Sequence, residues 1–321
     1  MRRIGAFLAG LALLAGCGAQ QQADEPAEYP TEEIRLLVPY AAGGPTDLTA
    51  RAYGSFLERD LGQPVVVENL PGGSGALATQ ELIQAEPDGH TLSLITAGTT
   101  VLTPLVNEVG YTAEDVTPVG VLSEVPSVLA VAADSPYPDL AAFVADARAR
   151  PGALTVGTPG ATTPQGIELQ RLRDEHGVEV TVVPFNGNAE MTTALLGRNV
   201  DAVLINASQD VTENIDAGEF RPLAVSSAQP LDWLPGTPTL VEAGFAGLTL
   251  SGSTFGLAGP AGLPEPVVTR LEEALRRGHA DPDVVATVGE RYLGPEFRGA
   301  AEMRAVLDET RAVYEPILGG S

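Results

Sequence analysis

Short apolar runs alternate with helical segments along most of the chain, and loops of small residues separate them. The first run, Ile34 to Val38, has the aliphatic character of a strand, and Pro39 ends it. A helical pattern then continues to about Asp60. Because strand, loop and helix recur in this order, the sequence predicts parallel sheets with crossover helices. The units recur in both halves, which predicts two similar lobes facing each other across a cleft.

The remaining elements follow from the same pattern. Further strands are expected at 64–68, 91–96, 118–133 with a break at Pro126, 153–157, 178–183, 201–205, 221–226 and 248–257. Further helices are expected at 76–85, 138–150, 165–175, 189–196, 211–217, 264–278, 282–290 and 299–314. The run from Pro64 to Glu68 is continuous and β-branched, as in a buried parallel strand.

The loop after the first strand is the most informative stretch. It contains Gly43 and Gly44, and either Thr46 or Asp47 can cap the helix that follows. A strand, a Gly-Gly loop and a helix start bring backbone N–H groups together without side chains in the way, and such a place binds anions, including carboxylates. An ordinary tight connection between a strand and a helix has the same sequence, so this stretch alone leaves both interpretations open.

The N-terminus has the pattern of a secretory signal. Met1 is followed by two arginines, and the apolar run 4–14 is too short for a membrane span. Leu14, Ala15, Gly16 and Cys17 resemble the bacterial lipobox, which predicts a lipoprotein signal peptide over 1–16 and lipidation at Cys17. A plain secretory peptide cut near Ala19 is the alternative. Residues 17–30 lack periodicity and are expected to form a disordered tether.

Composition excludes several classes of function. The net charge of −24 argues against nucleic acid or anionic lipid as a partner, so contact with a membrane is expected only through the lipid anchor. All 18 basic residues are arginine, which excludes Schiff-base lysine chemistry and a phosphate-binding P-loop lysine. Cys17 is the only cysteine, so no disulfide is expected.

Signals for catalysis are weak. Residues 72–76 miss the nucleophile-elbow pattern G-x-S-x-G at the last position. His90, His176 and His279 lie in predicted turns or helix ends, and none has metal-ligand spacing. The sequence therefore predicts a protein that is not an enzyme and has no metal or cofactor. Two convergent carboxylates could still escape detection in so acidic a chain.

A series of motifs over residues 29 to 316 resembles one family. The first lobe carries Val38-Pro39-Tyr40 with the Gly-Gly loop and Asp47, then 61–75, 87–92 and 96–104. The second lobe matches more loosely at 157–163, 183–187 and 195–201, and residues 255–264 resemble the return to the first lobe. In these motifs the chain is similar to the substrate-binding proteins of tripartite tricarboxylate transporters, also called TctC or Bug receptors.

The resemblance implies an α/β fold of the periplasmic-binding-protein type II kind, a Venus flytrap with a hinge and an interlobe cleft. Lobe 1 is expected to comprise 31–127 plus 252–321, and lobe 2 is expected to comprise 128–251. The implied function is an extracytoplasmic, lipid-anchored, monomeric protein that captures a small carboxylate. It would deliver that ligand to a multi-span permease with its small membrane subunit. A ligand-sensing receptor for a membrane signalling partner, or a secreted hydrolase, is the alternative.

The resemblance and the donors in these loops together imply the ligand-binding residues. They are Tyr40, Ala42, Gly43, Gly44, Thr46, Asp47, Thr96, Gly98, Thr99, Thr158, Gly160, Thr162, Thr163, Phe185, Asn186, Gly187 and Asn206. Each threonine can equally be a helix cap. Asp47 can cap its helix or accept a hydrogen bond from an amine, and Arg51, one turn later, is expected to pair with Asp47.

The second lobe departs from the family pattern at two positions. Asn186 stands where the family has a lysine, and Gly166 is near the place of a common histidine. These changes leave the ligand open among citrate-like acids, dicarboxylates, acidic amino acids and aromatic carboxylates.

Overall fold

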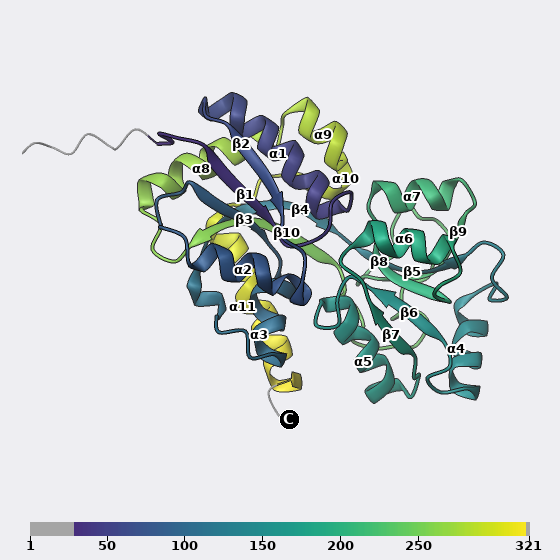
Figure 1. Cartoon of the computed structure of the whole chain (residues 1–321). Coiled ribbons are helices and arrows are strands. Elements are labelled where there is room, and N and C mark those ends of the chain that lie inside the picture. Colours follow the sequence, from purple (N-terminus) through teal and green to yellow (C-terminus); the bar gives the residue numbers. More distant parts are fainter. Residues whose placement is uncertain (1–28, 319–321) are drawn as a thin grey trace, which may run out of the picture.

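The computed structural model describes residues 29–318 as two α/β lobes, each built around one five-stranded sheet (Figure 1). The expected signal peptide, the expected lipidation site Cys17 and all but the last two residues of the expected tether lie outside the described residues. Within residues 29–318, no helix is both long enough and apolar enough to cross a membrane.

The two sheets have the same strand pattern. Lobe 1 has the order β2 (Val65–Asn69), β1 (Ile34–Val38), β3 (Thr91–Ile95), β10 (Ser253–Pro260) and β4 (Val116–Val125). Lobe 2 has the order β7 (Thr181–Pro184), β6 (Thr155–Thr158), β8 (Ala202–Asn206), β5 (Ser127–Ala132) and β9 (Phe220–Ser226). In each sheet the first three strands are parallel, and the fourth runs antiparallel to both neighbours. The expectation of parallel units repeated in two lobes is confirmed.

Helices cover both sheets. Those of lobe 1 are α1 (Pro45–Leu61), α2 (Ala76–Ile83), α3 (Thr103–Val106), α8 (Glu265–Gly278), α9 (Pro282–Val288), α10 (Glu290–Leu293) and α11 (Ala300–Leu318). Those of lobe 2 are α4 (Leu140–Ala149), α5 (Pro164–His176), α6 (Asn188–Leu196) and α7 (Gln209–Asp216). Short helical turns cover Gly73–Gly75, Gly98–Leu102 and Ala113–Asp115.

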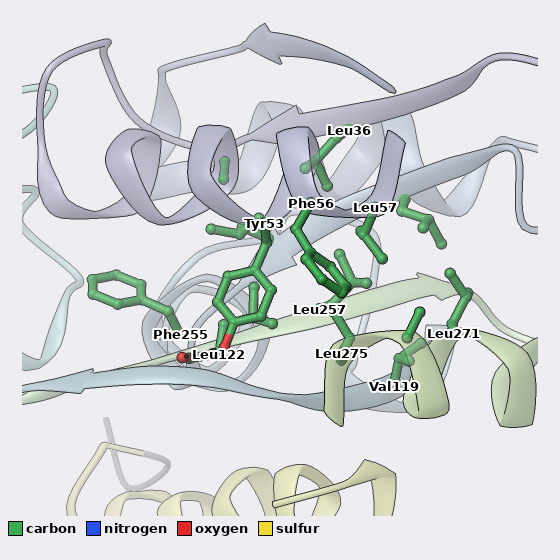
Figure 2. Close-up of a cluster of buried hydrophobic side chains, with 14 of the residues drawn as sticks. Leu36, Tyr53, Phe56, Leu57, Val119, Leu122, Phe255, Leu257, Leu271 and Leu275 are labelled. Carbon is green, nitrogen blue, oxygen red and sulfur yellow. Dashed lines mark hydrogen bonds between the residues drawn. The ribbon is translucent and has the colours of Figure 1, made fainter. Parts of the chain in front are cut away.

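The core of lobe 1 fixes α1 in place. Tyr53, Phe56 and Leu57 have the spacing of one helical face, and Figure 2 shows them pointing toward Leu122 and toward Leu275 of α8. Burying each such side chain contributes about 1.5–3 kcal/mol. The Tyr53 hydroxyl also donates to the Leu122 carbonyl at 3.2 Å. The N-terminus of α1 is thereby held on the side of the lobe that faces lobe 2.

The chain crosses between the lobes twice. The first crossing is Pro126, which separates β4 from β5, and the second is the segment that returns from β9 to β10. The Ser127 hydroxyl donates to the Ser251 carbonyl at 2.7 Å, so the two crossings are joined by a hydrogen bond. Two adjacent crossing segments are the usual construction of a hinge between lobes.

Three local predictions were wrong. The β-branched run forms the parallel strand β2 but lies at the sheet edge and is mostly half-exposed. The last strand begins at Ser253 rather than Leu248, because residues 248–252 form part of the second crossing. The N-cap of α1 is Gly44, and neither Thr46 nor Asp47 caps it, since Pro45 occupies the first helical position.

Candidate functional site

A small cavity of about 20 Å³ lies between the lobes, next to the two crossings. Lobe 1 contributes Tyr40, Gly44, Pro45, Thr46, Ser253 and Phe255, and lobe 2 contributes Pro159, Pro164, Gln165, Gly187, Asn188 and Asn206. This volume holds roughly one water-sized group. A carboxylic acid of several carbon atoms therefore enters only when the lobes separate.

Three helices begin at the cavity wall. Their first residues or N-caps line it: Gly44 and Pro45 for α1, Pro164 and Gln165 for α5, and Gly187 and Asn188 for α6. The first-turn N–H groups of a helix lack intrahelical acceptors, and the helix dipole places partial positive charge there. The three N-termini together give a positive, anion-binding environment, and none of the described residues that line the cavity is basic.

The two glycine loops approach each other closely across the cleft. A Cβ on Gly44 would lie 3.6 Å from the Asn188 backbone nitrogen, and one on Gly187 would lie 3.6 Å from the Ala41 nitrogen. The Ala41 N–H donates to the Asn186 carbonyl at 2.9 Å, which links the lobes directly. Larger side chains on these loops would hold the lobes apart.

A buried network of amides and hydroxyls forms one wall of the cavity. Nε2 of Gln165 donates to Ser127 Oγ at 3.1 Å and to Asn206 Oδ1 at 2.9 Å. The Ser253 hydroxyl donates to the same Asn206 oxygen at 3.0 Å. Since Ser127 also bonds the Ser251 carbonyl, this wall of the cavity is continuous with the two crossings between the lobes.

Tyr40 is the only titratable residue that lines the cavity among the described residues. Burial raises its pKa to about 12, so it stays a neutral phenol that can donate a hydrogen bond. The described residues of the site therefore interact with a bound anion only through helix dipoles and uncharged hydrogen-bond donors.

Asp47 is turned away from the cavity into lobe 1. Its carboxylate accepts hydrogen bonds from the Gly43 N–H at 2.9 Å, from Arg51 at 3.0 Å and from Asn69 at 3.0 Å. Burial opposes ionisation, but these hydrogen bonds outweigh it and hold the pKa of Asp47 below its ordinary value. The predicted pairing of Arg51 with Asp47 is confirmed.

The structure sorts the predicted site residues into two groups. Five of them line the cavity: Tyr40, Gly44, Thr46, Gly187 and Asn206. Most predicted threonines serve the local backbone instead. Thr96 and Thr99 each bind the other's N–H, and Thr158 and Thr163 both donate to the Gly160 carbonyl.

Other predicted residues lie at interlobe contacts or outside the cavity wall. The Thr162 hydroxyl is 3.1 Å from that of Thr103 across the lobes. Asn186 bonds Glu190 through its side chain. Ala42 and Gly43 are exposed on the loop before α1, Gly98 faces Pro164, Gly160 faces Ser74, and Phe185 packs on Gly157.

The expected ligand-binding residues given above do not include Gln165, Asn188 and Ser253, nor Pro45, Pro159, Pro164 and Phe255, all of which line the cavity. Gln165 and Asn188 each follow directly on a loop that was identified, within the first two helical positions. The signal that could have found them is therefore the helix start rather than the loop before it.

Two positions singled out in the sequence have structural explanations. A Cβ on Gly166 would overlap the Ala161 carbonyl oxygen, so the tight loop onto α5 excludes the family's histidine there. Ser74 lies in a left-handed turn with φ of 55°, and its hydroxyl accepts from the Thr162 N–H at 3.5 Å. Within residues 29–318 it forms no hydrogen bond with a histidine or a carboxylate. The contacts of Ser74 thus give no support to a nucleophile elbow at 72–76.

Comparison with known proteins identifies the family. The model of the tripartite tricarboxylate transporter family receptor matches residues 26–318. The chain belongs to this receptor family. Members of the family are extracytoplasmic solute-binding receptors rather than enzymes. The protein BugT of Bordetella pertussis is 30% identical over 313 residues, which cover 96% of this chain and 90% of BugT.

Solved structures agree on the two-lobed fold. MatC from Rhodopseudomonas palustris, solved with bound malate, matches with a TM-score of 0.83 and 28% identity over 90% of this chain and all of that chain. R. palustris Rpa4515, solved with adipate, matches with a TM-score of 0.81 and 30% identity over 90% of this chain and 97% of that chain. The receptor fold expected from the sequence motifs is confirmed.

Proposed function

We propose that this receptor captures a small carboxylate between its lobes and delivers it to a tripartite tricarboxylate-type membrane transporter. The observation that carries the proposal is the convergence of the N-termini of α1, α5 and α6 on one small cavity between the lobes. The similar proteins solved with malate and adipate support the ligand class.

Neutral donors suit reversible capture. A carboxylate bound to backbone N–H groups gains charge-assisted hydrogen bonds, while the receptor buries no second charge that would have to be desolvated. The chain carries a net charge of −24, so the dipoles at the cavity supply the local attraction that the overall charge does not.

The proposal includes the arrangement around this site. Lobe 1 (31–127 plus 252–321) and lobe 2 (128–251) separate about the two crossings to admit the ligand and close upon it. Cys17 carries the lipid that holds the receptor, as a monomer, outside the cell membrane. A multi-span permease and a small membrane subunit receive the ligand.

Thermal unfolding in the presence of candidate ligands tests the function. A ligand at 100 times its dissociation constant stabilises the folded state by about 2.7 kcal/mol, which appears as a higher melting temperature. We expect this rise with mono- or dicarboxylates and not with sugars or inorganic cations. Stabilisation by sugars or cations alone would refute the proposal.

A separate experiment tests the anchor. The Cys17→Ser variant is expected to appear in the soluble fraction instead of the membrane fraction and to bind the ligand as wild type does. Mass spectrometry of the wild-type N-terminus should show acyl chains on Cys17. A mature protein that begins elsewhere, without lipid, would contradict the anchor but not the carboxylate site.

A further inference from the structure

Gln165 carries a hydrogen-bond acceptor that the protein does not use. The residue is 1% exposed and lines the cavity, yet its Oε1 has no hydrogen-bond partner in the part of the chain that the structure describes. A buried acceptor without a partner costs about 1–3 kcal/mol. A hydrogen-bond donor supplied by the ligand would remove that cost.

The assignment of oxygen and nitrogen in this amide follows from counting protons. The Ser127 hydroxyl has one proton, and the Ser251 carbonyl, which can only accept, takes it at 2.7 Å. Ser127 Oγ must therefore accept from Gln165, so the Gln165 atom at 3.1 Å is the nitrogen. The unused atom of this side chain is the oxygen.

The same argument identifies the oxygen and the nitrogen of the Asn206 side-chain amide. Because Gln165 donates to it at 2.9 Å, the Asn206 atom in that contact is the oxygen, which also accepts from Ser253. The described residues form no hydrogen bond through Asn206 Nδ2. The wall of the cavity thus retains one free acceptor, on Gln165, and one free donor, on the neighbouring Asn206.

The surroundings decide which ligand group matches this pair. An ammonium group could donate to Gln165 but could not accept from Asn206. It would also face three partially positive helix ends, and no carboxylate of residues 29–318 lines the cavity. The nearby acids are committed elsewhere: Asp47 to Arg51, Glu190 to Asn186, and Glu168 to Ser226. A hydroxyl group donates and accepts, and it is neutral.

We propose that the ligand of this receptor is a hydroxy acid whose hydroxyl group donates to Gln165 Oε1 and accepts from Asn206 Nδ2. The proposal rests on the carboxylate-binding function above and adds a second requirement to it. A carboxylate held at the helix N-termini provides affinity, and the amide pair selects for the hydroxyl group.

Calorimetric titration of matched acids tests the proposal. The four-carbon series is succinate, malate and aspartate, and the three-carbon series is propionate, lactate and alanine. Within a series that binds, the hydroxy acid is expected to bind about 10- to 100-fold more tightly than the acid without the hydroxyl group. The amino acid should bind more weakly than the hydroxy acid.

Gln165→Met removes the acceptor at similar volume, and Gln170→Met, on the exposed face of the same helix, is the matched control. In Gln165→Met the dissociation constants of the hydroxy acid and of the unsubstituted acid should differ by less than about threefold. In Gln170→Met their ratio should stay as in wild type. If Gln165→Met fails to fold, the wild-type series alone decides the proposal.

The outcomes separate the two proposals. Equal or tighter binding of the unsubstituted acid, or of the amino acid, overturns the hydroxyl assignment and leaves the carboxylate function standing. Failure of every carboxylate to bind overturns both.

Discussion

Glu168 is a buried acid that should make the stability of this protein fall with rising pH. It lies on α5, one turn after Gln165, and is 1% exposed. Ser226 donates to its Oε1 at 2.8 Å, while its Oε2 has no hydrogen-bond partner. Burial, only partly offset by the nearby serines and Arg171, raises the pKa of Glu168 from 4.5 to about 7.

The groups around Glu168 explain why its charge is not compensated. Ser226 at the end of β9, Ser251 in the second crossing and Tyr314 of α11 face it, and all are neutral at ordinary pH. Arg171 is the only cation close by among the described residues, and its guanidinium is bound to Glu175 and to the Gly247 carbonyl. Ionised Glu168 therefore lies in a neutral, desolvated environment.

The magnitude follows from the pKa difference. Between about pH 4.5 and pH 7 the folded protein keeps a proton at Glu168 that the unfolded chain releases, so rising pH favours unfolding. A rise of roughly 2.5 pH units at about 1.4 kcal/mol each gives a loss of about 3 kcal/mol, complete above pH 7. Below pH 4.5 both states are protonated and the effect vanishes.

Glu168→Gln tests this reasoning, because glutamine keeps the shape and cannot ionise. Urea unfolding of the variant and of wild type should be measured at each half unit from pH 4 to pH 8.5. The free energy of unfolding of the variant, relative to wild type, should increase by about 3 kcal/mol across this range. Glu309→Gln, on the exposed surface of α11, controls for the chemical substitution. A difference between Glu168→Gln and wild type that is the same at pH 5 and pH 8 would refute the assignment.

Four further substitutions, at three positions, have defined outcomes. Gly44→Trp should fill the cleft and abolish carboxylate binding in calorimetry without changing the circular dichroism spectrum. Gly44→Ala, whose Cβ has only ordinary contacts, should bind normally. Asp47→Ala should lower the free energy of unfolding in urea by roughly 2–4 kcal/mol, because the Gly43 N–H and Arg51 lose their acceptor; a loss below 0.5 kcal/mol would contradict the inward role of Asp47. Gly166→Ala should displace the loop before α5 and weaken binding at least tenfold, and unchanged affinity would show that this loop does not shape the site.

The alternation of strands and helices could be predicted from the sequence because each element depends on local periodicity. The errors arose where tertiary position decides. The sequence of β2 is typical of an interior strand, yet β2 lies at the sheet edge. Whether a strand lies at the edge or in the centre of a sheet depends on which strands pair with it, and the residues Val65–Asn69 do not specify that pairing. Residues 248–252 have the composition of a strand but serve as a crossing between lobes.

The site was only partly predictable for a related reason. The glycine loops identify where the lobes meet, and Gly44 and Gly187 do line the cavity. Threonines in such loops can cap or bind ligand, and capping of the local backbone prevails at Thr96, Thr99 and Thr163. Gln165 gives no signal in isolation, because its role depends on Ser127 and Asn206, which lie 38 and 41 residues away in sequence.

Side chains of the cavity wall are hydrogen-bonded to Ser127, which joins the two crossings. Gln165 bonds Ser127, which directly follows Pro126, and Ser127 bonds Ser251 in the return segment. A ligand can favour the closed arrangement only by the contacts that it makes better there than in the open one. A ligand that contacts Gln165 of lobe 2 together with Ser253 or Phe255 of lobe 1 meets this condition, because these residues line the same cavity between the lobes. The bond from Ser253 of lobe 1 to Asn206 of lobe 2 belongs to the same network, so we expect a ligand bound at this wall to favour closure as well.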